Sequence, residues 1–99
     1  MTQIPTSDAP GPETPEAGLK RMKMRAWRRG TKEMDMILGP YADAHLAAMD
    51  ARTLALFDRL LWENDQDLFP WVMGKVSCPA EYVGLVMLIG DFARARLVR

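Results

Sequence analysis

The sequence predicts a small all-α protein, a bundle of four or five helices with a disordered N-terminal tail. Apolar residues recur at spacings of three and four over most of the chain, which is the helical period. No segment alternates apolar and polar residues for long enough to form a strand, and the connections are short. With 99 residues the chain is expected to form a single domain, residues 19–99, preceded by a tail of residues 1–18.

The tail holds four of the seven prolines, three acids and no base. Such a composition cannot bury enough apolar surface to offset the entropy of ordering, so it predicts disorder. It also differs from a secretory signal, which has a basic start and an apolar run, and from a mitochondrial presequence, which is rich in arginine. We therefore expect a cytoplasmic, bacterial protein. No segment has the 18–20 uninterrupted apolar residues, roughly, that a membrane span needs.

The first helix is expected over residues 19–29 and the second over the apolar stripe that follows. At 100° per residue the first helix has an apolar side and, opposite it, a row of arginines: Leu19, Met22 and Ala26 against Arg21, Arg25 and Arg28. The stripe of the second helix consists of Met34, Ile37, Leu38, Tyr41, His45 and Ala48. Gly39-Pro40 interrupts this stripe, and since proline removes an intrahelical hydrogen bond, a kink or short break is expected there.

Three further helices follow from caps and apolar faces. Asp50 fits the N-cap of a helix that buries Leu54, Phe57 and Leu61. Asn64 or Asp65 caps a short helix that ends near Gly74 and carries Leu68, Phe69, Trp71 and Val72. Pro79 fits the first turn of the last helix, with Glu81 near its positive end. That helix is expected to bury Tyr82, Leu85, Val86, Ile89 and Ala93.

The formal net charge of zero hides a segregated distribution. Residues 19–32 hold seven bases and no acid, whereas residues 33–81 hold nine acids and three bases. A basic helix of this kind is typical of a solvated face, of nucleic-acid contact or of membrane contact. The small apolar face argues against a membrane, and the acidic remainder would repel phosphates. A nucleic-acid-binding or antitoxin-type regulator stays the alternative function.

The remaining reactive or bulky residues are interpreted as structure. One Cys and one His allow neither an internal disulfide nor a Cys/His zinc site. His45 is expected to be packed and hydrogen-bonded, and Cys78 to be an N-cap or a small filler. Trp62, Phe69 and Trp71 are expected in the core. The acids Glu63, Asp65 and Asp67 lack the glycine and the closing glutamate of an EF-hand, so no metal is expected.

The junction between the first two helices groups charged residues around one glycine. Thr31 or Gly30 can cap the second helix, and Glu33 in its first turn suits the helix dipole. One interpretation is purely structural: the glycine ends the first helix, the acids cap the second, and Arg29 pairs with Glu33. The other is a partner surface: Gly30 has no Cβ, so another backbone can approach, and Arg29 and Glu33 offer a donor fork and an acceptor beside it.

With these residues the sequence resembles the small succinate dehydrogenase assembly factors, or flavinators. Their hallmark, Arg-Gly-x-x-Glu after a basic first helix, is present as Arg29-Gly30-Thr31-Lys32-Glu33. Downstream, Phe57-Asp58-Arg59-Leu60-Leu61 precedes an acidic turn and an aromatic helix, residues 64–71, and the match covers residues 20–96. The family often has Asp-Pro-Asp where this chain has Asp65-Gln66-Asp67. Proline there fixes a turn and does no chemistry.

The resemblance implies a five-helix bundle that binds the flavoprotein subunit of succinate dehydrogenase and promotes covalent attachment of FAD to it. Fumarate reductase subunits are implied as further clients. A carrier that itself holds FAD stays a further alternative. The attachment is viewed as autocatalytic in the client, so we predict a chaperone-like assembly factor, not an enzyme, with no catalytic residue and no cofactor of its own, monomeric when free. Arg29, Gly30 and Glu33 are expected at the centre of the partner contact. Flanking charges are expected from Arg28, Lys32 and Asp35.

Overall fold

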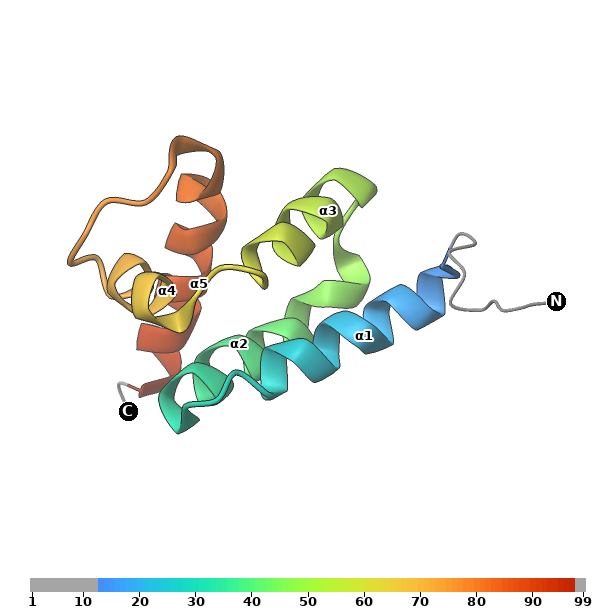
Figure 1. Cartoon of the computed structure of the whole chain (residues 1–99), viewed down its shortest axis with the longest axis horizontal. Helices are drawn as coiled ribbons and strands as arrows, with labels where there is room; N and C mark the ends of the chain where they lie inside the picture. Colours follow the sequence, from blue (N-terminus) through green and yellow to red (C-terminus); the bar gives the residue numbers. More distant parts are fainter. Residues whose placement is uncertain (1–12, 98–99) are drawn as a thin grey trace, which may run out of the picture.

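A computed structural model describes residues 13–97 of the chain (Figure 1). All the regular secondary structure in its described part is helical, which confirms the predicted all-α class. Five α-helices are joined by short connections, with a 3₁₀ turn after α2 and another before α5. The helices are α1 (Pro15–Trp27), α2 (Lys32–His45), α3 (Ala51–Leu60), α4 (Asp65–Val72) and α5 (Val83–Leu97). Most of the tail predicted to be disordered, residues 1–12, lies outside the described residues.

The first helix begins earlier than the sequence analysis expected, at Pro15 and not at Leu19, so residues 15–18 do not belong to a disordered tail. The Thr14 hydroxyl caps it by accepting a hydrogen bond from the amide of Ala17 at 3.1 Å. Proline stands at the first helical position and Glu16 in the first turn, both of which favour a helix start. The composition of the tail masked this start, because Pro and Glu are also typical of disordered segments.

Helices α1 and α2 form an antiparallel pair that runs along one side of the molecule (Figure 1). Their close approach depends on Gly39, where a Cβ atom would lie 2.3 Å from the indole ring of Trp27. The Trp27 indole N–H donates to the Asp43 carboxylate at 3.2 Å, so this ring is fixed across α2. The conformation of the ring therefore depends on the absence of a side chain at position 39.

Helix α2 continues through Pro40, so the break considered in the sequence analysis does not occur. Proline has no N–H to donate to the carbonyl of residue 36, four positions earlier. Arg96 of α5 supplies a donor instead, because its Nη1 donates to the Met36 carbonyl oxygen at 3.2 Å. The Met36 carbonyl group thus receives its hydrogen bond from another helix, and the local sequence does not indicate this contact.

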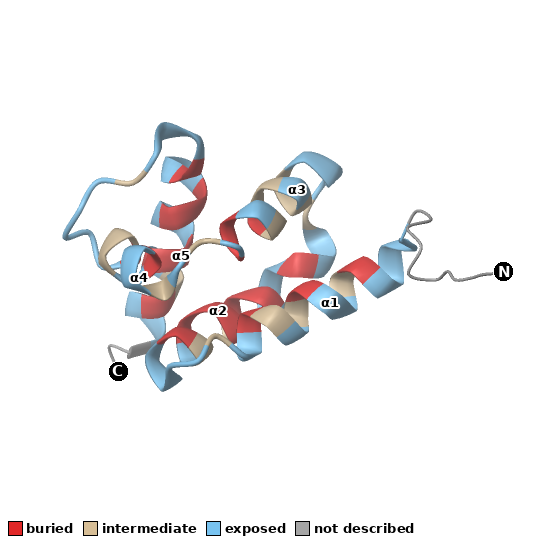
Figure 2. Cartoon of the chain, in the orientation of Figure 1, coloured by how far each residue is buried: buried red, intermediate tan, exposed pale blue. Residues whose placement is uncertain are grey.

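The core lies where the five helices converge, as the buried segments in Figure 2 show. The predicted apolar residues of α1, α3 and α5 lie in this core or pack against it. Two residues of the predicted second stripe, His45 and Ala48, are exposed. The α-helix ends at His45, and a 3₁₀ turn, Leu46–Ala48, places Leu46 in the core instead. The tighter turn changes the angle between successive side chains, so the helical period no longer holds.

Caps and close contacts position the last two helices. The Asp50 carboxylate accepts from the amide of Thr53 at 2.8 Å, which confirms the predicted cap of α3. Helix α4 ends before Gly74, whose φ of 75° is the left-handed conformation expected after a helix. At Gly90 a Cβ atom would lie 2.8 Å from the Val72 carbonyl oxygen, so α5 packs closely against the end of α4. Pro79 precedes a 3₁₀ turn, and α5 proper begins at Val83.

None of the helices in the described part of the chain is both long and apolar enough to cross a membrane.

Candidate functional site

The four-residue connection between α1 and α2 presents a glycine at the surface. Gly30 is exposed and has a φ of 107°, a conformation that residues with a side chain rarely adopt. No atom outside the adjacent residues lies within 4 Å of a Cβ built on it. Position 30 therefore requires glycine for its backbone conformation, while the space above it is open to a partner.

Arg29, beside this glycine, points into the protein. Its side chain is only 7% exposed, and its Nε lies 2.9 Å from a carboxylate oxygen of Asp65. Its two terminal nitrogens donate to the carbonyl oxygens of Leu61 and Glu63, at 2.5 and 2.8 Å. The alternative that Arg29 pairs with Glu33 is wrong, and in this structure the donor fork of Arg29 is occupied within the chain. The guanidinium instead joins the α1–α2 connection to the segment between α3 and α4.

Two further contacts hold the connection from the side of α2. The amide of Arg29 donates to the Asp35 carboxylate at 2.6 Å. The Thr31 hydroxyl accepts from the amide of Met34 at 3.3 Å, which confirms Thr31 as the N-cap of α2. Asp35, like Arg29, is thus occupied within the chain and fixes the backbone on which Gly30 is presented.

The other three predicted contact residues are exposed: Arg28, Lys32 and Glu33. Lys32 and Glu33 border a hollow of about 430 Å³ between α2, α4 and α5, whose walls include Met36, Phe69 and Met73. Phe69 is exposed at this wall and does not lie in the core as expected. The motif therefore divides into an inward part, Arg29 and Asp35, and an outward part around Gly30.

A second open hollow, of about 590 Å³, lies on the other side of Gly30. Its walls come from the end of α1, the α1–α2 connection and the segment between α3 and α4, and they include Arg25, Arg28, Gly30, Trp62 and Gln66. Trp62, which was also expected in the core, is 69% exposed. The guanidinium carbon of Arg25 lies 3.7 Å from the centre of the Trp62 ring, a close cation–π contact. Trp71, the third aromatic residue expected in the core, is half-buried and packs against Tyr82.

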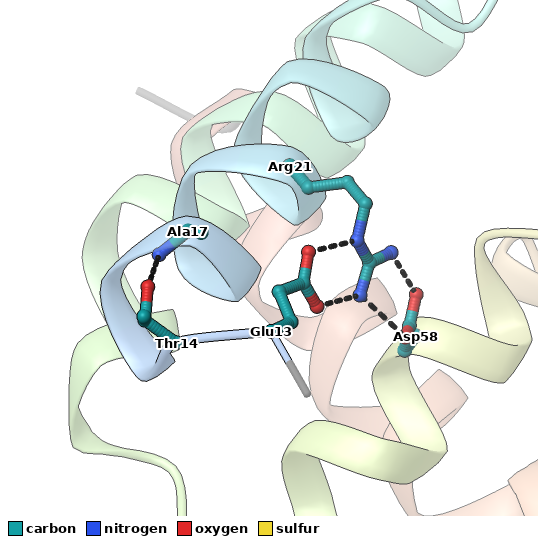
Figure 3. Close-up of polar contacts among 5 residues, drawn as sticks. All are labelled: Glu13, Thr14, Ala17, Arg21 and Asp58. Carbon is teal, nitrogen blue, oxygen red and sulfur yellow. Dashed lines mark hydrogen bonds and ion pairs between the residues drawn. The ribbon is translucent and has the colours of Figure 1, made fainter. Parts of the chain in front are cut away.

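The arginine row of α1 does not point uniformly to solvent, because it faces α3 and the residues that follow it. Arg21 binds Asp58 of α3 and Glu13 with two hydrogen bonds each, at 2.8 to 3.0 Å (Figure 3). The bonds to Asp58 and Glu13 raise the pKa of Arg21, and the bond from Arg21 lowers the pKa of the Glu13 carboxyl. The first arginine of the row is therefore neutralised, whereas Arg25 and Arg28, one and two turns further along, border the hollow.

Two of the three carboxylates in residues 63–67 bind partners within the chain. Glu63 accepts a hydrogen bond from the Tyr82 hydroxyl at 3.1 Å, and Asp65 pairs with Arg29. Burial of Tyr82, and then the hydrogen bond that its hydroxyl donates to Glu63, raise the pKa of Tyr82. Within residues 13–97 no group of three Cys, His, Asp or Glu side chains is arranged to hold a metal ion. Cys78 is half-buried against the core, and His45 lies on Tyr41 and Phe92 at the surface.

Sequence reasoning missed Arg25, Trp62 and Gln66 as residues of this surface. The available signal was a row of arginines in a segment without acids and, two helices later, a tryptophan between the end of a helix and an acidic turn. The three residues come together through the packing of α1 beside α3, which none of their local sequences indicates.

The chain matches one protein family over residues 20–97, and that family is described as flavinator of succinate dehydrogenase. Two relatives with this kind of description are eukaryotic. A mitochondrial succinate dehydrogenase assembly factor 2 of Cryptococcus neoformans is 38% identical over 68 residues, which are 69% of this chain and 39% of the relative. The corresponding protein of Aedes aegypti is 34% identical over 71 residues, 70% of this chain and 44% of the relative. The chain thus spans about two fifths of these two relatives.

A third relative is of similar size to this chain. The FAD assembly factor SdhE of Idiomarina loihiensis is 35% identical over 68 residues, 67% of this chain and 76% of the relative. These descriptions are of assembly factors and not of enzymes, in agreement with the class expected from the sequence.

Proposed function

This chain belongs to the family of succinate dehydrogenase flavinators, and we propose that it binds the flavoprotein subunit of succinate dehydrogenase and promotes covalent attachment of FAD to that subunit. The family membership covers residues 20–97, almost the whole described structure. FAD is the group attached to the client, and the chain holds no cofactor of its own. Its contribution is to hold the client in a conformation in which attachment proceeds.

One observation supports the location of the contact: Gly30 is exposed, open and held in a fixed left-handed conformation. An exposed glycine lets the client backbone approach closely, because there is no Cβ to exclude it. If the α1–α2 connection were flexible, it would lose conformational entropy when it became ordered on binding. Here Arg29 and Asp35 have already fixed the loop by their hydrogen bonds inside the chain. We therefore assign Arg29 and Asp35 a positioning role.

The residues proposed to touch the client are Gly30 and the exposed charges around it, Arg28, Lys32 and Glu33. Exposed charges at the edge of an interface act mainly on the association rate and on partner choice. Glu33 also borders the hollow that contains Phe69 and Met73, so an apolar side chain of the client can lie beside its carboxylate. The contact is thus expected to combine backbone approach at Gly30 with charge pairing around it.

The test is co-expression of a succinate dehydrogenase flavoprotein subunit with and without this chain. Flavin fluorescence that survives denaturing electrophoresis reports the covalent bond. We expect the wild-type chain to raise the flavinylated fraction and Gly30→Arg to abolish the increase. If flavinylation does not depend on the wild-type chain, the proposed function is wrong.

Gly74→Arg is the matched control for this variant. Gly74 also has a positive φ and also has no atom within 4 Å of its Cβ position, but it lies outside both hollows that flank the Arg29-Gly30 connection. Both substitutions therefore place the same side chain on an open glycine with a positive φ, 107° at Gly30 and 75° at Gly74. Equal loss of function in the two variants would show that strain, and not blocked contact at Gly30, explains the effect.

A further inference from the structure

We infer that the hollow bordered by Arg25, Arg28 and Trp62 receives an acidic surface segment of the client flavoprotein, with client carboxylates on the two arginines. This inference rests on the proposed function and specifies the chemistry of the partner at a second part of the surface. Arg25 and Trp62 lie outside the Arg-Gly-x-x-Glu motif, and Arg28 immediately precedes it.

The first step is the charge balance around the hollow. Among the described residues, Arg21, Arg29, Arg59 and Arg94 each pair with a carboxylate of the chain. Arg25 and Arg28 form no such ion pair within residues 13–97, although they lie one turn apart on the same helix end. Two adjacent cations without counter-charges favour an anion from outside.

The second step is that the nearby acids do not neutralise these arginines. Asp65 pairs with Arg29, and the Glu63 carboxylate accepts from Tyr82. Both acids line the same hollow, yet both are directed to partners within the chain. The wall formed by α1 therefore remains cationic where it faces solvent.

The third step is the state of Arg25 and Trp62. The Nε of Arg25 is buried without a hydrogen-bond acceptor in the described part of the chain, and its guanidinium carbon lies 3.7 Å from the centre of the Trp62 ring. The contact restrains both side chains before any partner binds, so binding would cost less rotamer entropy. Pre-ordered Trp and Arg side chains are the residue types most often found at energetic centres of interfaces.

The fourth step is continuity with the proposed contact. Gly30 lines the same hollow as Arg25 and Trp62, so a client segment that approaches the glycine also reaches the arginines. A carboxylate matches the planar donor geometry of a guanidinium, and an adjacent apolar group of the segment can cover the exposed face of Trp62.

The first test measures binding of the purified flavoprotein subunit, lacking covalent flavin, to four forms of the chain: wild type, Arg25→Gln, Arg28→Gln and the double variant. Arg52→Gln is the matched control, because Arg52 is exposed on α3, forms no ion pair within residues 13–97, and lies outside the hollow. We expect the double variant to weaken binding at least about tenfold and to reduce its salt dependence, with Arg52→Gln within about twofold of wild type. Circular dichroism checks that each variant is folded.

The second test identifies the client groups. Arg28→Lys places an amine in the hollow, and a carbodiimide then joins that amine to a carboxylate in direct contact. We expect a cross-linked peptide that contains position 28 and an Asp or Glu of the flavoprotein, and no such peptide at position 52 from Arg52→Lys. Titration of the chain alone with FAD is expected to show no binding at the hollow.

The outcomes separate the two proposals. If the wild-type chain neither binds the flavoprotein nor promotes flavinylation, the proposed function fails and this inference fails with it. If wild type does both while the double variant binds as Arg52→Gln does, only this inference is overturned. It is also overturned if FAD binds the free chain and the double variant abolishes that binding, because the anion would then be the flavin phosphate.

Discussion

The guanidinium of Arg29 lies 2.9 Å from the carboxylate of Asp65, 36 residues away in the sequence, in a pair whose side chains are only 7% and 17% exposed. Arg29 also donates to two carbonyl oxygens of the same segment, so it connects the α1–α2 connection with the start of α4. Arg29, the first residue of the motif, therefore has a structural role. It holds in place the connection on which Gly30 is exposed.

Replacing Asp65 by Ala is expected to lower the free energy of unfolding by about 2 kcal/mol, because it leaves the enclosed charge of Arg29 without its counter-ion. Urea unfolding followed by circular dichroism measures the change. Asp67→Ala is the matched control, since Asp67 lies in the same first turn of α4 but is exposed. Equal losses in the two variants would show that the effect comes from the helix dipole and not from the Arg29 pair.

Gly39→Ala is expected to destabilise the fold by about 2 kcal/mol or more, because the added methyl would lie 2.3 Å from the Trp27 ring. Gly84→Ala, in α5, meets nothing within 4 Å and should be neutral or stabilising by up to about 1 kcal/mol. Thermal unfolding of both variants checks the contrast. Near-ultraviolet circular dichroism should change in Gly39→Ala alone, as Trp27 is displaced. Retention of wild-type stability by Gly39→Ala would contradict the close packing.

Arg96→Ala is expected to cost about 1 kcal/mol, because the Met36 carbonyl would lose the donor that replaces the missing amide of Pro40. The reason is testable by a double-mutant cycle. In a Pro40→Ala background the helix can supply its own amide, so Arg96→Ala should cost less there than in the wild type. Arg94→Ala, which removes only an exposed pair with Asp91, serves as the control. Additive effects of the two substitutions would rule out the compensation.

Acid is expected to destabilise the N-terminal ends of α1 and α3. Hydrogen bonding from Arg21 lowers the pKa of Glu13, and the amide of Thr53 lowers the pKa of Asp50. A carboxyl group whose pKa is lower in the folded chain stabilises it above the unfolded pKa, about 4, and this stabilisation is lost as the pH falls through the folded value.

Stability measured by urea unfolding should therefore be level above about pH 5 and decline toward pH 3. Asparagine caps a helix nearly as well as aspartate but does not titrate, so Asp50→Asn should reduce the decline. Glu13→Gln should reduce it independently, because Glu13 and Asp50 form no contact with one another. A profile that is unchanged in both variants would assign the acid sensitivity to other carboxylates.

The sequence alone established the helices and most of the core. The apolar period of a helix, its capping residues and the residues that end it are local properties of the sequence. Thr31 and Asp50 could therefore be assigned as N-caps, and the buried residues of α5 as core, from the sequence alone. The start of α1 and the end of α2 were misplaced, because Pro15 and Glu16 fit either a tail or a helix start and the 3₁₀ turn at Leu46 breaks the period. The sequence also determined the family, through a motif whose spacing is fixed within a few residues.

Only the tertiary structure decided which members of that motif face outward. Arg29 and Arg28 are adjacent and chemically identical, yet one is enclosed by carbonyl oxygens and Asp65 while the other lies at the surface. The difference depends on where the segment between α3 and α4 packs, and that is set by contacts more than 30 residues apart in the chain. The same packing brings Arg25 to Trp62. A linear sequence specifies which groups can pair, but the geometry of the assembled helices selects which pairs form.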